Sequence, residues 1–179
     1  MLFQRSKIGD SYYDSLQLRC RERDIFCICM KTLANGVDLS EIVERLKAAK
    51  AEDRGLWGVM NAGEMICHLR GALRVAMGEL PADPIRMGIP PAVIKFTALW
   101  TPIPWRKNFE TVPVLKRGTP TMQVCAFETD RADVLAELER FCRPEQVRVD
   151  HSFFGAMSFE DWMRWGYLHT DHHLRQFGR

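Results

Sequence analysis

Residues 158–179 read SFEDWMRWGYLHTDHHLRQFGR, and this stretch governs how the rest of the chain is interpreted. Ser158 followed three residues later by Asp161 is a capping-box pattern, which marks the start of a helix. Tryptophans and histidines then recur at helical spacing up to Gln176. We therefore predict a helix that begins at Ser158, runs to the chain end and turns an aromatic face towards a core.

Two histidines, His169 and His173, lie on that face. Each residue advances by about 100° around a helix, so the residues within about 40° of His169 are Trp162, Trp165, His173 and Gln176. His172 falls at the edge of this stripe, and Asp171 lies on the opposite side. Two imidazoles at positions i and i+4 can chelate one metal ion. The alternative is that these histidines lie in a solvated last turn, where the helix dipole stabilises a cationic histidine.

Three further helices are predicted upstream. The first spans about residues 39–50, as the spacing of its apolar residues indicates. The second runs from Asn61, an N-cap with Glu64 at position N3, to just before Pro81. The third runs from Asp130 to Pro144. Residues 80–129 between the last two are rich in proline; within them, 91–100 favours a short helix and 121–127 an extended segment. We predict an all-α fold, a four-helix bundle with one long proline-rich crossover between the second and third helices.

The crossover carries Trp100, Trp105 and Phe109, which are candidates either for the walls of a pocket or for simple core filling.

Cys67 points about 100° away from its neighbour His68 on a helix, so a Cys–His pair is not expected. His151 stands in a polar loop, where we expect it to be solvated or to cap a turn.

His68 lies on a mostly apolar face of the second helix. If the second and fourth helices are neighbours, His68 completes a three-histidine site with His169 and His173. Three neutral imidazoles suit zinc, nickel or ferrous iron and leave a position open for water or substrate, as catalytic sites do. The alternative for His68 is a satisfied core histidine. Glu64, one turn earlier, is either an acceptor that orients the site or only a helix cap.

Composition excludes several classes of protein. The chain has 179 residues, 46% hydrophobic and 27% charged, as ordinary globular proteins do. Its net charge of +2 gives no basic footprint for nucleic acid, and it has no apolar run of membrane-spanning length. Six cysteines without regular spacing do not indicate a disulfide framework, so we expect a cytoplasmic protein.

The chain divides unevenly. Residues 1–29 lack clean periodicity, whereas a compact domain is expected over residues 30–179. We interpret residues 1–29 as an N-terminal extension, loosely attached or upstream of the true translation start. The alternative is an additional helix packed on the body.

Three segments carry a resemblance to a known family. WGVMNAGEMICHLRGALRVAMGE (57–79), PWRKN (104–108) and WGYLHTDHHLRQFGR (165–179) resemble the DinB/YfiT-like superfamily, and more narrowly a branch known only as a domain of unknown function. The resemblance covers residues 30–179. The HxxxHxxQ pattern of His169, His173 and Gln176, with His68 upstream, is similar to the metal-site signature of that superfamily.

The resemblance implies a four-helix bundle, a divalent metal, usually nickel or zinc, on the three histidines, and frequent homodimers. Some members transfer low-molecular-weight thiols such as bacillithiol or mycothiol, some isomerise maleylpyruvate with a thiol, and many have no assigned reaction. We therefore expect a metal-dependent enzyme, a thiol-dependent S-transferase or a hydrolase, acting on a small electrophilic molecule. The alternatives are a non-catalytic protein that binds metal or a small ligand, and an interaction module without metal.

Overall fold

The computed structural model describes residues 30–179, so the predicted extension of residues 1–29 lies outside the described part. The described residues form helices and no strand, which confirms the all-α class. The α-helices are α2 (Gly36–Ala48), α3 (Ala62–Ala76), α4 (Pro91–Trp100), α5 (Phe127–Phe141) and α6 (Phe159–Gln176). Two short 3-10 helices, η1 (Pro113–Leu115) and η2 (Pro120–Met122), lie between α4 and α5.

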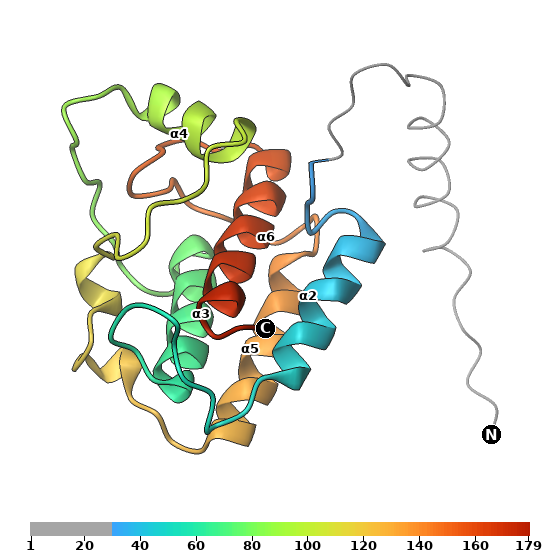
Figure 1. The fold of residues 1–179 in the computed structure, drawn as a ribbon. Helices are drawn as coiled ribbons and strands as arrows, with labels where there is room; N and C mark the ends of the chain where they lie inside the picture. The colour runs from blue at the N-terminus through green and yellow to red at the C-terminus, as the bar shows by residue number, and fades with distance from the viewer. Residues whose placement is uncertain (1–29) are drawn as a thin grey trace. The chain divides into compact units, whose positions relative to one another are not determined.

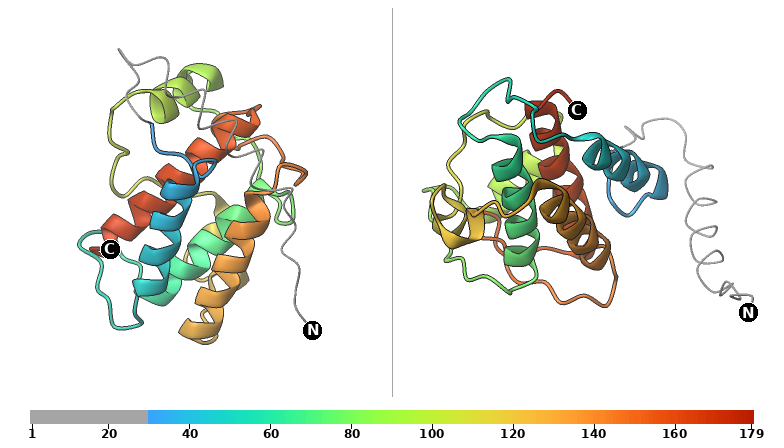
Figure 2. Two further views of the ribbon diagram at one scale, coloured as in Figure 1. Left: turned by 90° about the vertical axis from the view of Figure 1, so that its right-hand side faces the viewer. Right: turned by 90° about the horizontal axis from the view of Figure 1, so that it is seen from below.

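The longer helices pack in pairs that share one core. α3 lies along α5, α2 lies along α6, and α3 also contacts α6 (Figures 1 and 2). The chain between α3 and α5 contains α4, which packs on α6, and η1 and η2, which pack on α3. The helix predicted over residues 91–100 is confirmed. The extended segment predicted over residues 121–127 is confirmed only in part: it begins inside η2 and ends in the first residue of α5, and between them Gln123 and Ala126 have extended backbone without forming a strand.

Local caps set the ends of the two helices that matter most for the site. At α3, Asn61 Oδ1 accepts the Glu64 N–H and the Glu64 carboxylate accepts the Asn61 N–H, both at 2.9 Å. At α6, Ser158 and Asp161 make the same reciprocal pair at 3.1 Å. Each pair satisfies backbone donors that a helix start leaves free. Both capping boxes were predicted, and both are confirmed.

The other two helices begin earlier than expected. α2 starts at Gly36, because the Asn35 side chain accepts the N–H groups of Val37 and Asp38. α5 starts at Phe127, so Asp130 lies within its first turn rather than before it. From there the Asp130 carboxylate accepts the Cys125 N–H at 3.0 Å, and thereby holds the entry to the helix.

The core is apolar and continuous across the helices. Its fully buried side chains include Ile42, Leu46, Met65, Ile66, Leu138, Phe141, Met163 and Leu174. Gly166 permits the closest approach: a Cβ there would lie 2.5 Å from the Leu33 side chain and 3.0 Å from the Phe141 ring. Within residues 30–179, no helix combines the length and the apolar character needed to cross a membrane.

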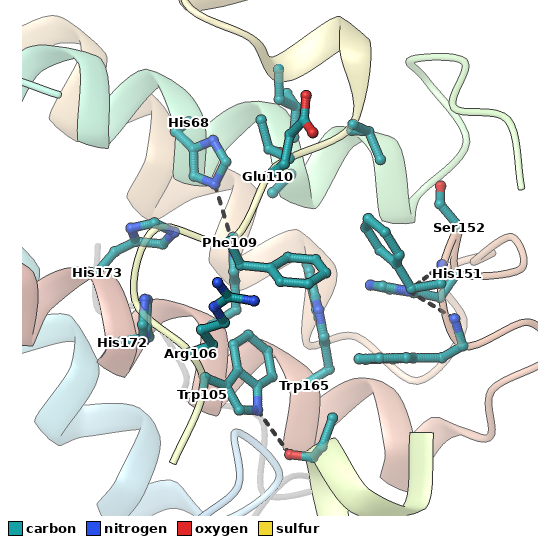
Figure 3. Close-up of a pocket in the computed structure, with 18 of the residues that line it drawn as sticks. His68, Trp105, Arg106, Phe109, Glu110, His151, Ser152, Trp165, His172 and His173 are labelled. Atoms are coloured by element: carbon teal, nitrogen blue, oxygen red, sulfur yellow. Dashed lines mark hydrogen bonds between the residues drawn. The ribbon is translucent and has the colours of Figure 1, made fainter. Parts of the chain in front are cut away.

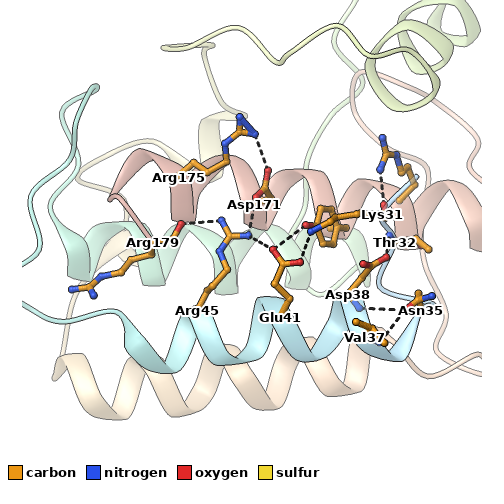
Figure 4. A network of polar contacts seen from close by, with 12 residues as sticks. Lys31, Thr32, Asn35, Val37, Asp38, Glu41, Arg45, Asp171, Arg175 and Arg179 are labelled. Carbon is orange, nitrogen blue, oxygen red and sulfur yellow. Dashed lines mark hydrogen bonds and ion pairs between the residues drawn. The ribbon is translucent and has the colours of Figure 1, made fainter. Parts of the chain in front are cut away.

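Ion pairs hold the outer side of α6 against α2 (Figure 4). Arg45 of α2 donates to the Asp171 carboxylate at 2.8 Å and to the Arg179 carbonyl at 2.9 Å. Arg175 reaches the second oxygen of Asp171 at 3.3 Å. Because Asp171 lies on the side of α6 opposite to His169 and His173, the Arg45–Asp171 pair favours the rotation of α6 that turns both histidines inward.

The core makes a quantitative prediction at Phe141, which is 0% exposed and meets the edges of Trp162 and Trp165. Phe141→Ala leaves a cavity beneath α6, so we expect the free energy of unfolding to fall by about 3–5 kcal/mol. Urea denaturation measures it. The matched control Val147→Ala removes a side chain that is 72% exposed, and should stay within about 0.5 kcal/mol of wild type. Equal effects of the two variants would contradict the described core.

Candidate metal centre and pocket

Three histidines meet where α3 contacts α6. His68 comes from α3, and His169 and His173 come from successive turns of α6. One ring nitrogen from each lies within 4.8 Å of the other two. The Nε2 atoms of His68 and His169 are 3.3 Å apart, and the His68 ring meets the His173 ring edge-on at 4.6 Å between centroids (Figure 3). The structure thus brings together the three residues predicted from sequence; that they bind a metal stays a prediction.

The nitrogen spacing fits a metal ion. Two imidazole nitrogens bound to zinc at about 2.0–2.1 Å with tetrahedral angles lie about 3.3–3.4 Å apart. The observed separation of 3.3 Å between the Nε2 atoms of His68 and His169 falls within that range. The His173 nitrogen lies within the same 4.8 Å limit, so a small adjustment of one ring completes a three-nitrogen face. The donor set suits zinc, nickel or ferrous iron.

The rings are neutral, as metal ligands must be. Burial lowers the pKa of His68 from 6.5 to about 4, with a smaller contribution from His172. Burial likewise holds the pKa values of His169 and His173 well below their usual range, and neighbouring histidines lower them further. A buried imidazole resists a proton because its charged form loses hydration. Each ring therefore carries one nitrogen lone pair at neutral pH.

Gln176 orients His173. Its amide Nε2 donates to the Trp57 carbonyl at 2.7 Å, which turns the amide oxygen towards His173 Nδ1 at 3.0 Å. An amide oxygen only accepts, so His173 carries its proton on Nδ1 and keeps the Nε2 lone pair free. Such contacts to the far nitrogen of a ligand fix both the tautomer and the ring orientation. This contact gives the glutamine of the HxxxHxxQ pattern a physical role.

His172 lies outside the cluster, although it lines the same pocket. Its ring faces Trp57 at 5.9 Å and Trp105 at 6.2 Å between centroids. The sequence favoured His173 over His172 because of the i, i+4 spacing with His169, and the observed cluster contains His173.

Glu64 acts as a helix cap, which was the second of its two predicted roles. Its carboxylate accepts the Asn61 N–H and an Arg117 N–H at 2.6 Å. Within residues 30–179, no hydrogen bond joins Glu64 to His68. Cys67 turns its thiol towards the Gln123 carbonyl at 3.6 Å, and burial raises the pKa of that thiol to about 11. Neither side chain is placed to assist chemistry at the cluster.

The cluster opens onto a cavity of about 900 Å³ with mostly apolar walls. Trp105 and Phe109 line it, as one of the two interpretations of the sequence predicted (Figure 3). Trp100 does not line it; its indole N–H donates to Asp161 at 2.9 Å, so its role is to support the start of α6. The Trp165 ring stacks on His169 at 4.9 Å and 10°, which joins the cavity wall to the histidine cluster.

Sequence reasoning missed part of the pocket. His151 was expected to be solvated or to cap a turn; it does cap a turn, but it also lines the cavity. Arg106, which reaches the cavity from the chain between α4 and η1, lies in the PWRKN segment that carries the family resemblance, but no role was predicted for it (Figure 3). Neither residue has a local sequence signal, because each enters the pocket through long-range folding of an irregular segment.

The buried neutral histidines predict acid sensitivity of the metal-free protein. His68 and His151 both have a pKa of about 4 in the folded protein against 6.5 ordinarily. Below about pH 6.5 the unfolded chain therefore binds more protons than the folded one, and stability is lost as the pH falls from about 6.5 towards 4. Urea titrations across this window measure the loss. His68→Gln should have a shallower pH dependence than wild type; an equal slope would contradict a neutral His68.

Gln176 makes a separate prediction for metal affinity. Gln176→Leu removes the acceptor that orients His173, so we expect the dissociation constant for zinc to rise about 10–100-fold. Competition with a chelating dye measures it. The control Arg175→Leu changes an exposed neighbour on the same turn and should leave the affinity unchanged. A similar loss in both variants would assign the effect to the end of α6 and not to the contact with His173.

The comparisons with known proteins agree with this geometry. The model of the DinB superfamily matches residues 34–177, a range that contains all three clustered histidines. No curated protein and no solved structure matches the chain. The family match spans most of the chain, and we conclude that this protein belongs to the DinB superfamily, a metal-binding family.

Proposed function

We propose that this protein is a metal-dependent enzyme that acts on a small, mostly apolar electrophile, with a low-molecular-weight thiol as co-substrate. The observation that carries the proposal is that the histidine cluster forms part of the wall of the 900 Å³ cavity. Small-molecule sites are commonly concave, mostly apolar and equipped with a few convergent polar groups. A divalent ion on three neutral imidazoles would supply Lewis acidity, and would lower the pKa of a thiol or water that reaches it.

No fourth protein ligand accompanies the cluster among residues 30–179. Structural zinc sites are usually closed by four protein ligands, whereas catalytic sites keep a position open. The three neutral imidazoles leave the charge of a bound ion unbalanced, which favours an anionic fourth partner. This supports an open catalytic site over a closed structural one.

Arg106 supports an anionic co-substrate such as a thiolate. It lines the cavity, and within residues 30–179 its guanidinium has no ion-pair or hydrogen-bond partner (Figure 3). A free cation at the mouth raises the local positive potential, which attracts anions and favours a thiolate over a thiol. The nearby Glu110 does not offset it, because Lys116 pairs with that carboxylate. The apolar walls would hold the electrophile.

The alternative is a non-catalytic protein that uses the same site to hold a metal or a small ligand. It has the same fold and the same cluster, so turnover is what separates the two. The small-molecule substrate, a cytoplasmic location and a homodimer also belong to the proposal.

Metal content tests the site. Protein purified without an affinity tag should contain about one equivalent of divalent metal by elemental analysis, and His169→Ala should lose it. His172→Ala is the matched control, since it removes a neighbouring imidazole of the same helix that lies outside the cluster; it should keep its metal. Loss of metal in His172→Ala alone would show that the ligand set is wrong.

Turnover tests the function. Metal-loaded protein is assayed against aryl halides, epoxides and activated esters, with bacillithiol, mycothiol, glutathione or no thiol. We expect thiol-dependent consumption of an electrophile that falls at least 100-fold in His68→Ala and survives in His172→Ala. Hydrolysis without thiol would favour the water reaction. Full metal occupancy with no turnover of any substrate would favour the binding protein.

A further inference from the structure

His151 presents a hydrogen-bond donor to the pocket from outside the histidine cluster. Its Nδ1 accepts the backbone N–H groups of Phe153 and Phe154, at 3.2 and 3.3 Å. An imidazole nitrogen that accepts a hydrogen bond carries no proton, so the neutral ring has its proton on Nε2. Burial lowers the pKa of His151 to about 4, which keeps the ring in this neutral form at neutral pH.

Aromatic rings hold the His151 side chain in place. Phe154 stacks on it at 4.2 Å between centroids and 11° between planes. Trp162 and Trp165 contact it at 5.6 Å each. The edge of the ring opposite the turn faces the interior of the cavity, beside Phe109 and Trp165 (Figure 3). The direction of the Nε2–H bond is therefore fixed by the fold before any ligand binds.

That donor has no acceptor in the described part of the chain. The hydrogen bonds of His151 within residues 30–179 all run through Nδ1 or its backbone. Around Nε2 the walls are aromatic; Phe109 and Phe153, for example, pair with their rings 5.3 Å apart. Among the described residues, Nε2 of His151 is not one of the fully buried side-chain nitrogens without a partner, so water in the cavity can reach it. A ligand that displaces this water leaves the donor unpaired unless the ligand brings an acceptor of its own. A ligand in the cavity would supply that acceptor.

One indole ring separates His151 from the metal site. Trp165 contacts His151 on one side and stacks on His169 at 4.9 Å on the other. A ligand that lies against Trp165 therefore has the histidine cluster at one end and the His151 donor at the other. The donor is uncharged and would leave the charge of a carboxylate unbalanced, and burying such a charge costs far more than burying an uncharged oxygen such as a carbonyl.

We propose that His151 is the polar anchor of the pocket, donating a hydrogen bond from Nε2 to a carbonyl-type oxygen of a largely apolar ligand whose other end lies at the His68, His169 and His173 cluster. The proposal names the substrate class for the function proposed above, and to that extent it rests on that function. The role of His151 in ligand binding is distinct from its role in the turn, and two substitutions separate them.

His151→Asn and His151→Gln form a matched pair. The asparagine oxygen takes the position of Nδ1 and can still accept the backbone N–H groups of the turn, but this variant has no group at Nε2. The glutamine amide nitrogen reaches the position of Nε2 and can donate there, but this variant lacks the turn acceptor. A purely structural His151 would therefore tolerate Asn better than Gln, whereas the anchor role predicts the reverse order for ligand binding.

The probes are 2-acetylnaphthalene and 2-isopropenylnaphthalene, which share a shape and differ in that only the ketone has an acceptor. Equilibrium dialysis against the full-length, metal-loaded protein gives both dissociation constants. We expect wild type to prefer the ketone by about three- to tenfold, the size of one neutral hydrogen bond. His151→Asn should lose this preference with an unchanged melting temperature, and His151→Gln should keep part of it. Two-bond proton–nitrogen spectra should show the Nε2–H tautomer for His151 in wild type.

Repeating the dialysis on metal-stripped protein separates the anchor from the metal. Under the proposal, the preference for the ketone survives metal removal and disappears in His151→Asn. A preference that persists in His151→Asn and disappears with the metal would place the carbonyl on the ion and overturn the proposal. Equal affinities for the two probes, no binding of either, or an Nδ1–H tautomer would also overturn it. Metal content and turnover of the same samples report separately on the proposed enzyme function.

Discussion

The close approach of α3 to α6 at His68 and His169 is the contact on which the site depends. Two imidazole nitrogens lie 3.3 Å apart, so close that a proton or a cation between them is needed to offset the repulsion of their lone pairs. Without metal, one ring donates to the other. Metal binding needs both Nε2 lone pairs, which requires the donating ring to move its proton to Nδ1. A metal that binds only the folded chain also stabilises it by mass action, so the contact couples metal loading to the stability of the α3–α6 pair.

The two sides of α6 have different roles in forming the site. Its inner side carries the histidines and Trp165, while Asp171 on its outer side is held by Arg45 of α2. A single ion pair of this kind contributes little stability on its own. The ion pair fixes the orientation of α6 about its axis, because a rotation that moved the histidines out of the site would break the Arg45–Asp171 contact. Gly166 lets Leu33 and Phe141 approach α6 closely one turn before His169, which packs this part of the helix against the core.

The features that could be predicted from sequence are those encoded within one helix. The caps at Asn61 and Ser158 depend on residues three positions apart, and consecutive members of the pattern His169, His173 and Gln176 are three or four positions apart. His68 could be added only by assuming that two helices are neighbours, which the structure bears out. The early start of α5 was missed because no side chain caps the helix at Ala126, so no capping pattern marks that end. The places of His151 and Arg106 in the pocket were missed because each depends on contacts between residues far apart in sequence. Periodicity carries no information about such contacts.

The cavity is built from two kinds of structure. The histidines that could hold a metal stand on α3 and α6, whose positions the core determines, whereas Trp105, Arg106 and Phe109 come from the irregular chain between α4 and η1. Irregular segments accept insertions and substitutions more readily than packed helices do. A lineage could therefore exchange this segment and admit a different molecule while the donor set beneath it stays the same. The fold separates the three-histidine donor set from the walls that select a ligand, so that one cluster can be combined with a succession of pockets.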